Sequence, residues 1–159
     1  MFIEKINSPR DIKNIKQENL PELASEIRNV IVDTISKTGG HIASSLGVVD
    51  LTVALHYCFD IEQDKFIWDV GHQSYVHKIL TGRAKDFKNL RQYNGLSGYI
   101  DKNESKYDIW ESGHSSTTIS AMAGILPCLD KDTFCISLIG DSSISNGVSF
   151  EGLNYINSV

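Results

Sequence analysis

The sequence predicts an α/β protein in which helices flank a parallel sheet. Two short apolar runs, residues 66–68 and 133–139, have the length and residue types of buried strands. Segments with helical periodicity precede the first run and separate it from the second. Strands separated by helices are typical of parallel sheets, because a parallel connection has to cross back over the sheet. With 159 residues the chain has the length of one domain and can bury a sizeable core.

The first third of the chain is predicted to be helical. Ser8 and Pro9 are typical of a helix start, with a serine N-cap and proline at the first position. A stronger helix follows residues 20–21 and ends at two glycines, residues 39–40. Its apolar residues fall on one helical face and are Leu23, Ile27, Val30, Ile31 and Ile35. Residues 48–59 are apolar almost all round, which predicts a buried helix with His56 as a core histidine.

The second half alternates loops, helices and one strand. Residues 69–72 form the loop after the first strand, and residues 75–80 are predicted to be a helix that stops at residues 81–82. Residues 89–111 have no periodicity, and long irregular segments in compact domains are often functional. Residues 114–118 are predicted to start a helix, and a further helix is expected after the turn that ends the second strand.

Composition excludes several classes of function. The net charge is −5 and the basic residues are scattered, which argues against a nucleic-acid surface. The N-terminus lacks the apolar core of a signal peptide, and no apolar run approaches the ~20 residues of a membrane span. The three cysteines, Cys58, Cys128 and Cys135, lie in apolar stretches and are predicted to be buried free thiols. These features predict a cytoplasmic protein.

Three loops carry glycine beside histidine or aspartate, at residues 39–41, 69–72 and 113–116. Glycine lets a backbone approach a ligand closely, and histidine can transfer protons near neutral pH. The third loop resembles a phosphate site most, because hydroxyls and free N–H groups at a helix start attract anions. The alternative for this loop is an ordinary N-cap with a solvated histidine.

The turn at Gly140-Asp141 follows the second strand, where open α/β sheets bind ligands. A carboxylate there suits a hard cation that carries a phosphate group, although Asp141 is equally suited to cap the following helix. His72 and His77 are spaced as a conceivable zinc pair, but no third ligand lies at a recognisable spacing. The glycine-rich signatures of nicotinamide and P-loop sites are absent.

Taken in order, these segments resemble the 1-deoxy-D-xylulose-5-phosphate synthases, which are thiamine-diphosphate enzymes related to transketolase. The resemblance covers about residues 6–154 and rests on residues 36–56 (SKTGGHIASSLGVVDLTVALH), 68–73 (WDVGHQ), 78–83 (KILTGR), 95–98 (GLSG) and 113–117 (GHSST). It implies a thiamine-diphosphate-binding fold in which residues 1–159 are the N-terminal part of the diphosphate-binding domain.

The resemblance also implies roles for individual residues. His72 and the Gly113-His114-Ser115 turn would contact the cofactor, and Asp141 would ligate the Mg²⁺ that holds its diphosphate. Ser142 and Ser143 would lie beside the phosphates. His41, together with His72, would be catalytic, with His41 transferring protons near the substrates.

The reaction implied is the condensation of pyruvate with glyceraldehyde 3-phosphate, with loss of CO₂. Its product feeds isoprenoid, thiamine and pyridoxal synthesis, so the family is a cytoplasmic transferase with neither nucleic-acid nor membrane partners. A homodimer or other self-association is expected, because a truncated parallel sheet exposes an edge and an apolar face.

Departures from the family pattern bear on activity. Ser142 replaces a glycine, residues 145–146 replace a small glycine-containing pair, and Ser45 stands where the family usually has asparagine. The family's second Mg²⁺ ligand, its pyrimidine-binding domain and its activating glutamate would lie beyond Val159. The chain is therefore expected to be inactive alone. The alternatives are one chain of a split transketolase-like enzyme and a degenerate module that keeps the fold for binding or assembly.

Overall fold

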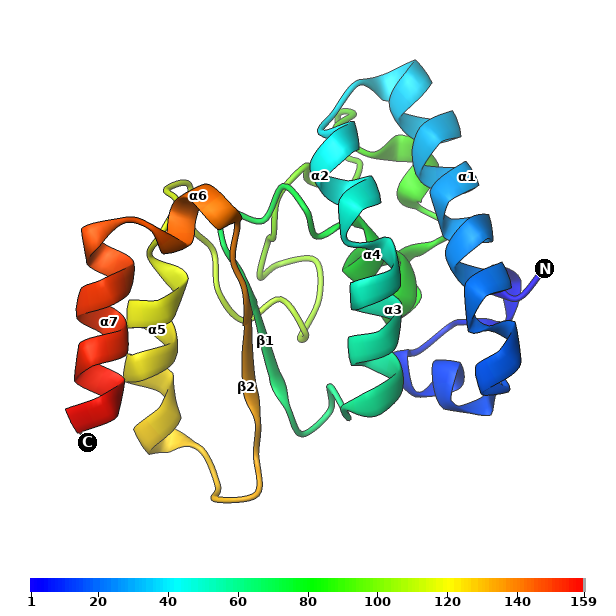
Figure 1. Ribbon diagram of the computed structural model, residues 1–159. Helices are drawn as coiled ribbons and strands as arrows, with labels where there is room; N and C mark the ends of the chain where they lie inside the picture. The colour runs from blue at the N-terminus through cyan, green and yellow to red at the C-terminus, as the bar shows by residue number, and fades with distance from the viewer. Residues whose placement is uncertain (159) are drawn as a thin grey trace. The chain divides into compact units, whose positions relative to one another are not determined.

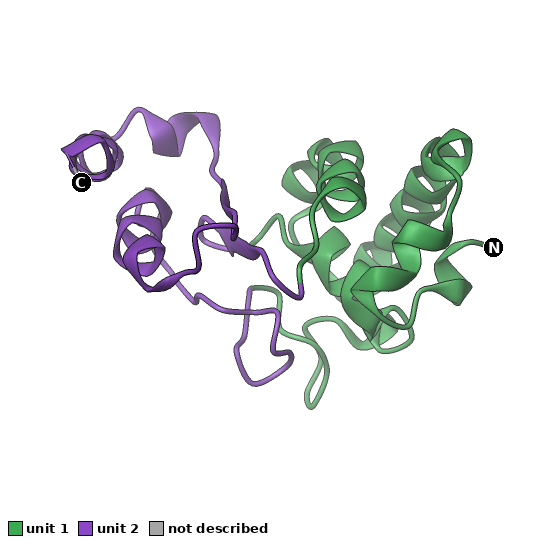
Figure 2. Ribbon diagram, turned by 90° about the horizontal axis from the view of Figure 1, so that it is seen from below, with its two compact units in different colours: residues 1–61, 72–99 green, residues 62–71, 100–159 purple. Residues whose placement is uncertain are grey.

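The structure is a computed structural model that describes residues 1–158 (Figure 1). The chain divides into two compact units, shown in different colours in Figure 2. Unit 1 comprises residues 1–61 and 72–99, and unit 2 comprises residues 62–71 and the chain from residue 100 onward.

Unit 1 is helical. Its α-helices are α1 (Leu20–Thr38), α2 (Ile42–Gly47), α3 (Val49–Cys58) and α4 (Tyr75–Lys78), the last followed by the π-helical turn η4 (Ile79–Arg83). Short 3₁₀ helices complete it: η1 (Ile3–Lys5), η2 (Pro9–Asn14), η3 (Gln17–Asn19) and η5 (Phe87–Asn89). The predicted stop after α4 is confirmed, because Gly82 leaves the helical region with φ of 91°.

The apolar stripe of α1 forms the core of unit 1, as the sequence predicts. Leu23, Ile27, Ile31 and Ile35 are buried, and Gly39 ends the helix with its N–H bonded to the Ile35 carbonyl. The predicted start at Ser8 is also a helix start, but the helix is the 3₁₀ segment η2. Asp11 closes its capping box by accepting the backbone N–H of Ser8.

Two burial predictions are wrong. Helix α3 is not buried all round, since Leu51 on it is 53% exposed. Cys58 and Cys128 are exposed free thiols and Cys135 is half-buried. Cys58 is the last residue of α3, and Cys128 ends the 3₁₀ helix η6 (Leu126–Cys128). An apolar neighbourhood in sequence predicts burial poorly at the end of an element, where the chain turns to the surface.

Unit 2 contains the sheet. Strands β1 (Lys65–Trp68) and β2 (Cys135–Leu138) pair in parallel, from Lys65 opposite Cys135 to Trp68 opposite Leu138. This confirms both strand predictions and the parallel arrangement. Helix α5 (Thr118–Ile125) packs on both strands, and α7 (Gly147–Ser158) packs on α5, while α6 (Asp141–Ile144) follows β2 directly (Figure 1).

Close packing of α7 on α5 depends on a small residue. A Cβ at Gly152 would lie 2.9 Å from Ile119 Cγ2 and 3.0 Å from the Ser120 nitrogen. The observed architecture is thus mixed, with a helical unit and a unit in which helices cover a two-stranded parallel sheet. Within residues 1–158, none of the helices has the length and apolar character needed to cross a membrane.

Candidate functional site

The loop that carries His41 is supported from below by a buried tyrosine. Gly40 has a φ of 146°, and a Cβ on it would lie 2.9 Å from the Tyr75 hydroxyl oxygen. The backbone N–H of His41 donates to that oxygen at 3.5 Å. Burial raises the pKa of the Tyr75 phenol, which therefore stays protonated near neutral pH. Glycine at position 40 lets the loop lie directly on Tyr75 and sets His41 at the start of α2.

Two of the predicted site residues, His41 and His72, lie together in unit 1. Their ring centroids are 5.2 Å apart in an edge-to-face arrangement, and the ring of Tyr99 lies 5.6 Å from that of His41. His41 Nδ1 is buried and has no hydrogen-bond partner among residues 1–158. An imidazole nitrogen without a protein partner is available to a ligand or to proton transfer.

Ser45 fixes the backbone at His72. Its hydroxyl, which is buried on α2, donates to the His72 carbonyl at 3.1 Å. The loops carrying His41 and His72 are thereby joined through α2. The serine that departs from the family pattern has a structural use here, because it ties α2 to the second histidine.

A second histidine pair lies in the core of unit 1. His56 Nε2 is 3.2 Å from His77 Nδ1, and both side chains are buried. Burial lowers the pKa of His56 well below its usual value, and the charges of His77 and Lys13 act in the same direction. The prediction that His56 is a core histidine is confirmed, and its Nε2 is paired with His77. In the described part of the chain, no cluster of three histidine, cysteine or acidic side chains has the geometry of a metal site.

In unit 2, the buried carboxylate of Asp69 holds the turn that contains His114. Asp69 is the first residue after β1, and it accepts the N–H of Ser116 and the hydroxyl of Thr118, each at 3.1 Å. Ser116 has a φ of 72°, a conformation that is uncommon for serine. Sequence reasoning gave Asp69 no role. The signal was an acidic residue directly after an apolar strand, where its charge needs nearby donors.

The remaining residues of this turn face solvent. Gly113, His114 and Ser115 are exposed, and a Cβ at Gly113 would meet no atom within 4 Å. The N-cap position of α5 is Thr117, whose side chain makes no capping bond. The ordinary N-cap interpretation is therefore wrong about the capping group, because the N–H of Ser116 donates to Asp69 and no N-cap side chain accepts it. It is right about His114, which is exposed to solvent.

The turn after β2 presents Asp141 without a capping role. Gly140 is the N-cap of α6, and Asp141 is the first helical residue. Its carboxylate is exposed and makes no hydrogen bond or ion pair with any of the described residues. The alternative that Asp141 caps the helix with its side chain is wrong. Ser142 lies in α6 with a negative φ, so serine in place of glycine costs no backbone strain.

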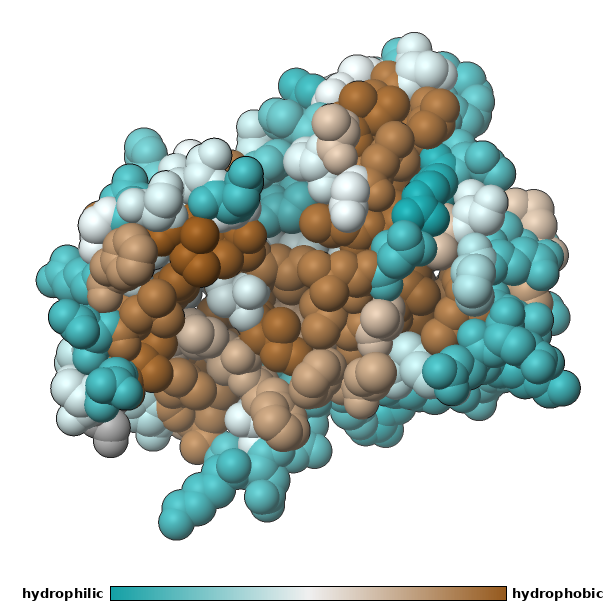
Figure 3. Space-filling view, viewed as in Figure 1, coloured by the Kyte–Doolittle hydropathy of each residue, from teal (hydrophilic) through white to brown (hydrophobic). Residues whose placement is uncertain are grey.

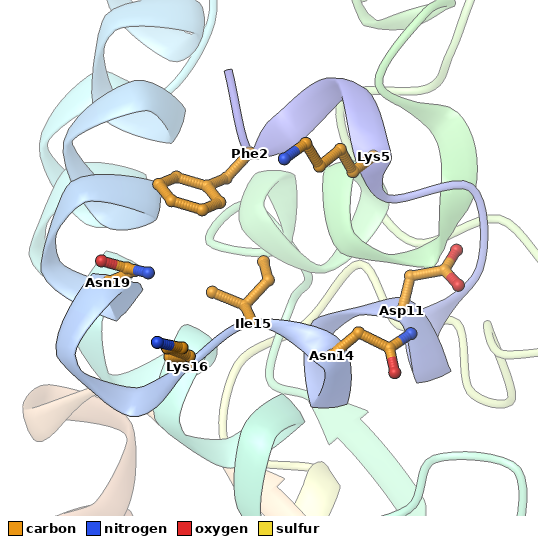
Figure 4. Close-up of a pocket in the computed structure, with 7 residues that line it drawn as sticks. All are labelled: Phe2, Lys5, Asp11, Asn14, Ile15, Lys16 and Asn19. Carbon is orange, nitrogen blue, oxygen red and sulfur yellow. The ribbon is translucent and has the colours of Figure 1, made fainter.

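The pocket in Figure 4 lies elsewhere, beside η1, η2 and the start of α1. Its lining residues are Phe2, Lys5, Asp11, Asn14, Ile15, Lys16 and Asn19. None of the predicted site residues belongs to it. The Asp11 carboxylate accepts hydrogen bonds from the N–H groups of Asn7 and Ser8, and these bonds lower its pKa. Asp11 therefore acts as a helix cap.

Comparison with known proteins gives one consistent result. The family model described as 1-deoxy-D-xylulose-5-phosphate synthase matches residues 3–159. The chain is 54% identical to the 1-deoxy-D-xylulose-5-phosphate synthase of Desulfotalea psychrophila over 157 residues, which is 97% of this chain and 24% of that protein. It is 52% identical to the synthase of a Geobacillus species, covering 98% of this chain and 25% of the relative. For the synthase of Clostridium acetobutylicum the identity is 56%, covering 92% and 24%.

The chain thus spans about a quarter of the length of the curated relatives it matches. Identity of this level over nearly the whole chain exceeds what a shared fold alone produces. The chain belongs to the 1-deoxy-D-xylulose-5-phosphate synthase family.

Proposed function

We propose that this chain supplies the diphosphate-binding part of an enzyme that condenses pyruvate with glyceraldehyde 3-phosphate and releases CO₂. The observation that carries the proposal is that two candidate turns lie at the carboxyl ends of the two parallel strands in unit 2. Asp69 directly follows β1 and holds the turn at Ser116, while the Gly140-Asp141 turn follows the parallel neighbour β2. The carboxyl ends of parallel strands are the usual ligand site of α/β sheets.

The residues in unit 2 fit a magnesium diphosphate group. Asp141 has an exposed carboxylate that makes no hydrogen bond or ion pair with any described residue, and Ser142 and Ser143 have hydroxyls next to it in the sequence. The Ser116 hydroxyl is buried and lacks a partner within residues 1–158, as expected of a group that serves a ligand. Mg²⁺ prefers octahedral oxygen coordination, so Asp141 would be one ligand among several, the others coming from phosphates, water and further protein oxygens.

Thiamine diphosphate, when bound, supplies the carbanion and the electron sink for decarboxylation. The chain's own contribution is placement and proton transfer. In this proposal Gly113, His114 and Ser115 contact the cofactor, and the turn at Asp141 anchors the diphosphate. His72 is proposed as a cofactor-binding and catalytic residue on the resemblance alone. His41 exchanges a proton near the substrates, for which its unpartnered Nδ1 is suited.

Calorimetric titration of the native protein that contains this chain tests the diphosphate site. Thiamine diphosphate is expected to bind in the presence of Mg²⁺ and to lose affinity at least tenfold in Asp141→Asn, because one charged metal ligand is lost. Asp130→Asn, which removes an exposed carboxylate from the same unit, is the matched control. Equal affinity in the presence and absence of Mg²⁺, or equal losses in both variants, would refute the proposal.

We also propose that the 159-residue chain is inactive alone, since its relatives are about four times as long. Release of CO₂ from pyruvate by the purified chain would contradict this. A stable partner chain that co-purifies from the native source and restores turnover would favour the split enzyme. Backbone strain at Ser142 gives the non-catalytic alternative no support, because Ser142 lies in α6 with a negative φ.

Self-association and a cytoplasmic location complete the proposal. Apolar surface is visible on unit 2 in Figure 3. The exposed large apolar side chains of this unit lie just before β2, in α6 and in α7. They are Phe134, Ile144, Val148, Phe150, Leu153 and Tyr155. Exposed apolar surface of this kind favours association, which light scattering tests; a monomer at high concentration would contradict it. The three free cysteines are typical of a reducing compartment.

A further inference from the structure

One buried hydroxyl in unit 2 contacts both candidate turns. Ser149 lies in the first turn of α7 and is fully buried. Its Oγ donates to the Ser143 carbonyl at 2.8 Å and lies 3.4 Å from the Ser116 carbonyl. A serine hydroxyl has a single proton, which the two carbonyls must share or receive in alternation.

We propose that Ser149 is a positioning residue that couples the two turns of the diphosphate site. Ser116 is then held from both sides, with its N–H bonded to Asp69 and its carbonyl facing Ser149. Its left-handed φ of 72° persists only where the surrounding structure fixes it. The same hydroxyl holds Ser143, two residues after Asp141. Ordering one turn therefore favours order in the other. The inference rests on the proposed function only for the identity of the ligand.

A purely spatial role for Ser149 is the alternative. Gly152 lies three residues further along α7 and allows the close approach to α5, where a Cβ would meet Ile119 and Ser120. Ser149 shares this buried face as another small residue. The substitution Ser149→Ala separates the two roles, because alanine keeps the small size and removes the hydroxyl.

Two control variants match the two roles. Ser145→Ala removes an exposed hydroxyl that donates to the Ser142 carbonyl at 2.8 Å in the same turn but reaches no second turn. Gly152→Ala disturbs the packing of α7 on α5 and leaves the Ser149 hydroxyl in place.

Amide hydrogen exchange of the 159-residue chain, read by NMR, is the test. The N–H of Ser116 bonds to Asp69 and that of Ile144 to the Gly140 carbonyl, so each reports one turn. In Ser149→Ala both amides are expected to exchange about tenfold faster, the size of one lost buried hydrogen bond. The N–H of Lys65, bonded to the Phe134 carbonyl at the other end of the sheet, is the reference.

Ser145→Ala is expected to leave Ser116 unchanged, and Gly152→Ala to affect the reference amide as well. An unchanged Ser116 rate in Ser149→Ala, or an equal change in Ser145→Ala, overturns the coupling. Magnesium pyrophosphate then serves as the probe. In the wild-type chain it should slow exchange in both turns together, and in Ser149→Ala in one turn alone. If it protects neither turn of the wild-type chain, the diphosphate site fails, while the ligand-free rates still decide the role of Ser149.

Discussion

Unit 1 contains two histidine pairs with nearly the same ring separation and opposite surroundings. The centroids of His41 and His72 are 5.2 Å apart, and those of His56 and His77 are 5.3 Å apart. The second pair is buried and joined by a direct nitrogen–nitrogen hydrogen bond. The first pair is half-buried, lies where two glycine-containing loops meet α2, and leaves His41 Nδ1 without a partner among the described residues.

The difference shows that ring proximity says little about what a histidine does. Burial favours the neutral form of His56, and its Nε2 pairs with His77 inside the core, so His56 contributes to folding. His41 keeps a nitrogen for another molecule, which suits proton transfer. Changes to the buried pair should therefore alter stability most, and changes around the half-buried pair should alter stability less and binding more.

Removal of a buried histidine should have the largest effect. His77→Ala leaves a cavity and strips His56 of its hydrogen-bond partner, which is expected to cost about 2–4 kcal/mol of unfolding free energy. His72→Ala should cost less than about 1 kcal/mol, because its side chain is half-buried. Urea unfolding measures both. Similar losses in the two variants would remove the distinction between the pairs.

A side chain at Gly40 should destabilise the loop that carries His41. Gly40→Ala places a Cβ 2.9 Å from the Tyr75 hydroxyl and forces a non-glycine residue to a φ of 146°. The expected cost is about 1–3 kcal/mol. Gly39→Ala is the control, since its φ is also positive but no atom lies within 4 Å of the added Cβ. The free energy of unfolding should be lower for Gly40→Ala than for Gly39→Ala. The reverse order would show that the Tyr75 side chain moves aside at little cost.

Acid should destabilise the chain through His56. The pKa of His56 is lowered in the folded state, so below about pH 6.5 the unfolded state binds more protons than the folded state. Stability is therefore full above that pH and falls as the pH decreases, by at most about 1.4 kcal/mol per pH unit for one histidine. Urea midpoints between pH 7.5 and 5.5 measure the slope. The pH dependence of the urea midpoint should be weaker in His56→Asn than in His41→Asn. Equal pH dependence in the two variants would show that another group takes up the proton on unfolding.

Periodic and local signals predicted most of the fold. The stripe of α1, both strands and their parallel pairing follow from spacings that the chain carries within single segments. Contacts between distant segments did not follow. Asp69 bonds to Ser116 across 47 residues, and Ser149 reaches Ser116 across 33, and no spacing rule connects such positions.

The candidate residues were identified by resemblance, and their surroundings were not. The loops indicated His41 and His72, but nothing in their sequence indicated that Tyr75 lies beneath Gly40. Exposure of Cys58 and Cys128 was missed for a related reason, because both lie near the ends of apolar helical segments. Burial depends on how elements pack, which the sequence of one element does not contain.

The smallest expected effect concerns the serine that ties α2 to His72. Ser45→Ala removes the hydrogen bond from its hydroxyl to the His72 carbonyl and should cost about 0.5–1.5 kcal/mol. Ser36→Ala removes an exposed hydroxyl that bonds the Asp33 carbonyl at 2.8 Å, and should cost less than about 0.5 kcal/mol. The informative measurement is the NMR chemical shift of the His72 ring. If the Ser45 hydrogen bond only stabilised the fold, the ring would keep its position in Ser45→Ala. Displacement of His72 in Ser45→Ala, with His56 and His77 unchanged, would show that the half-buried pair is held by its loops while the buried pair is held by the core.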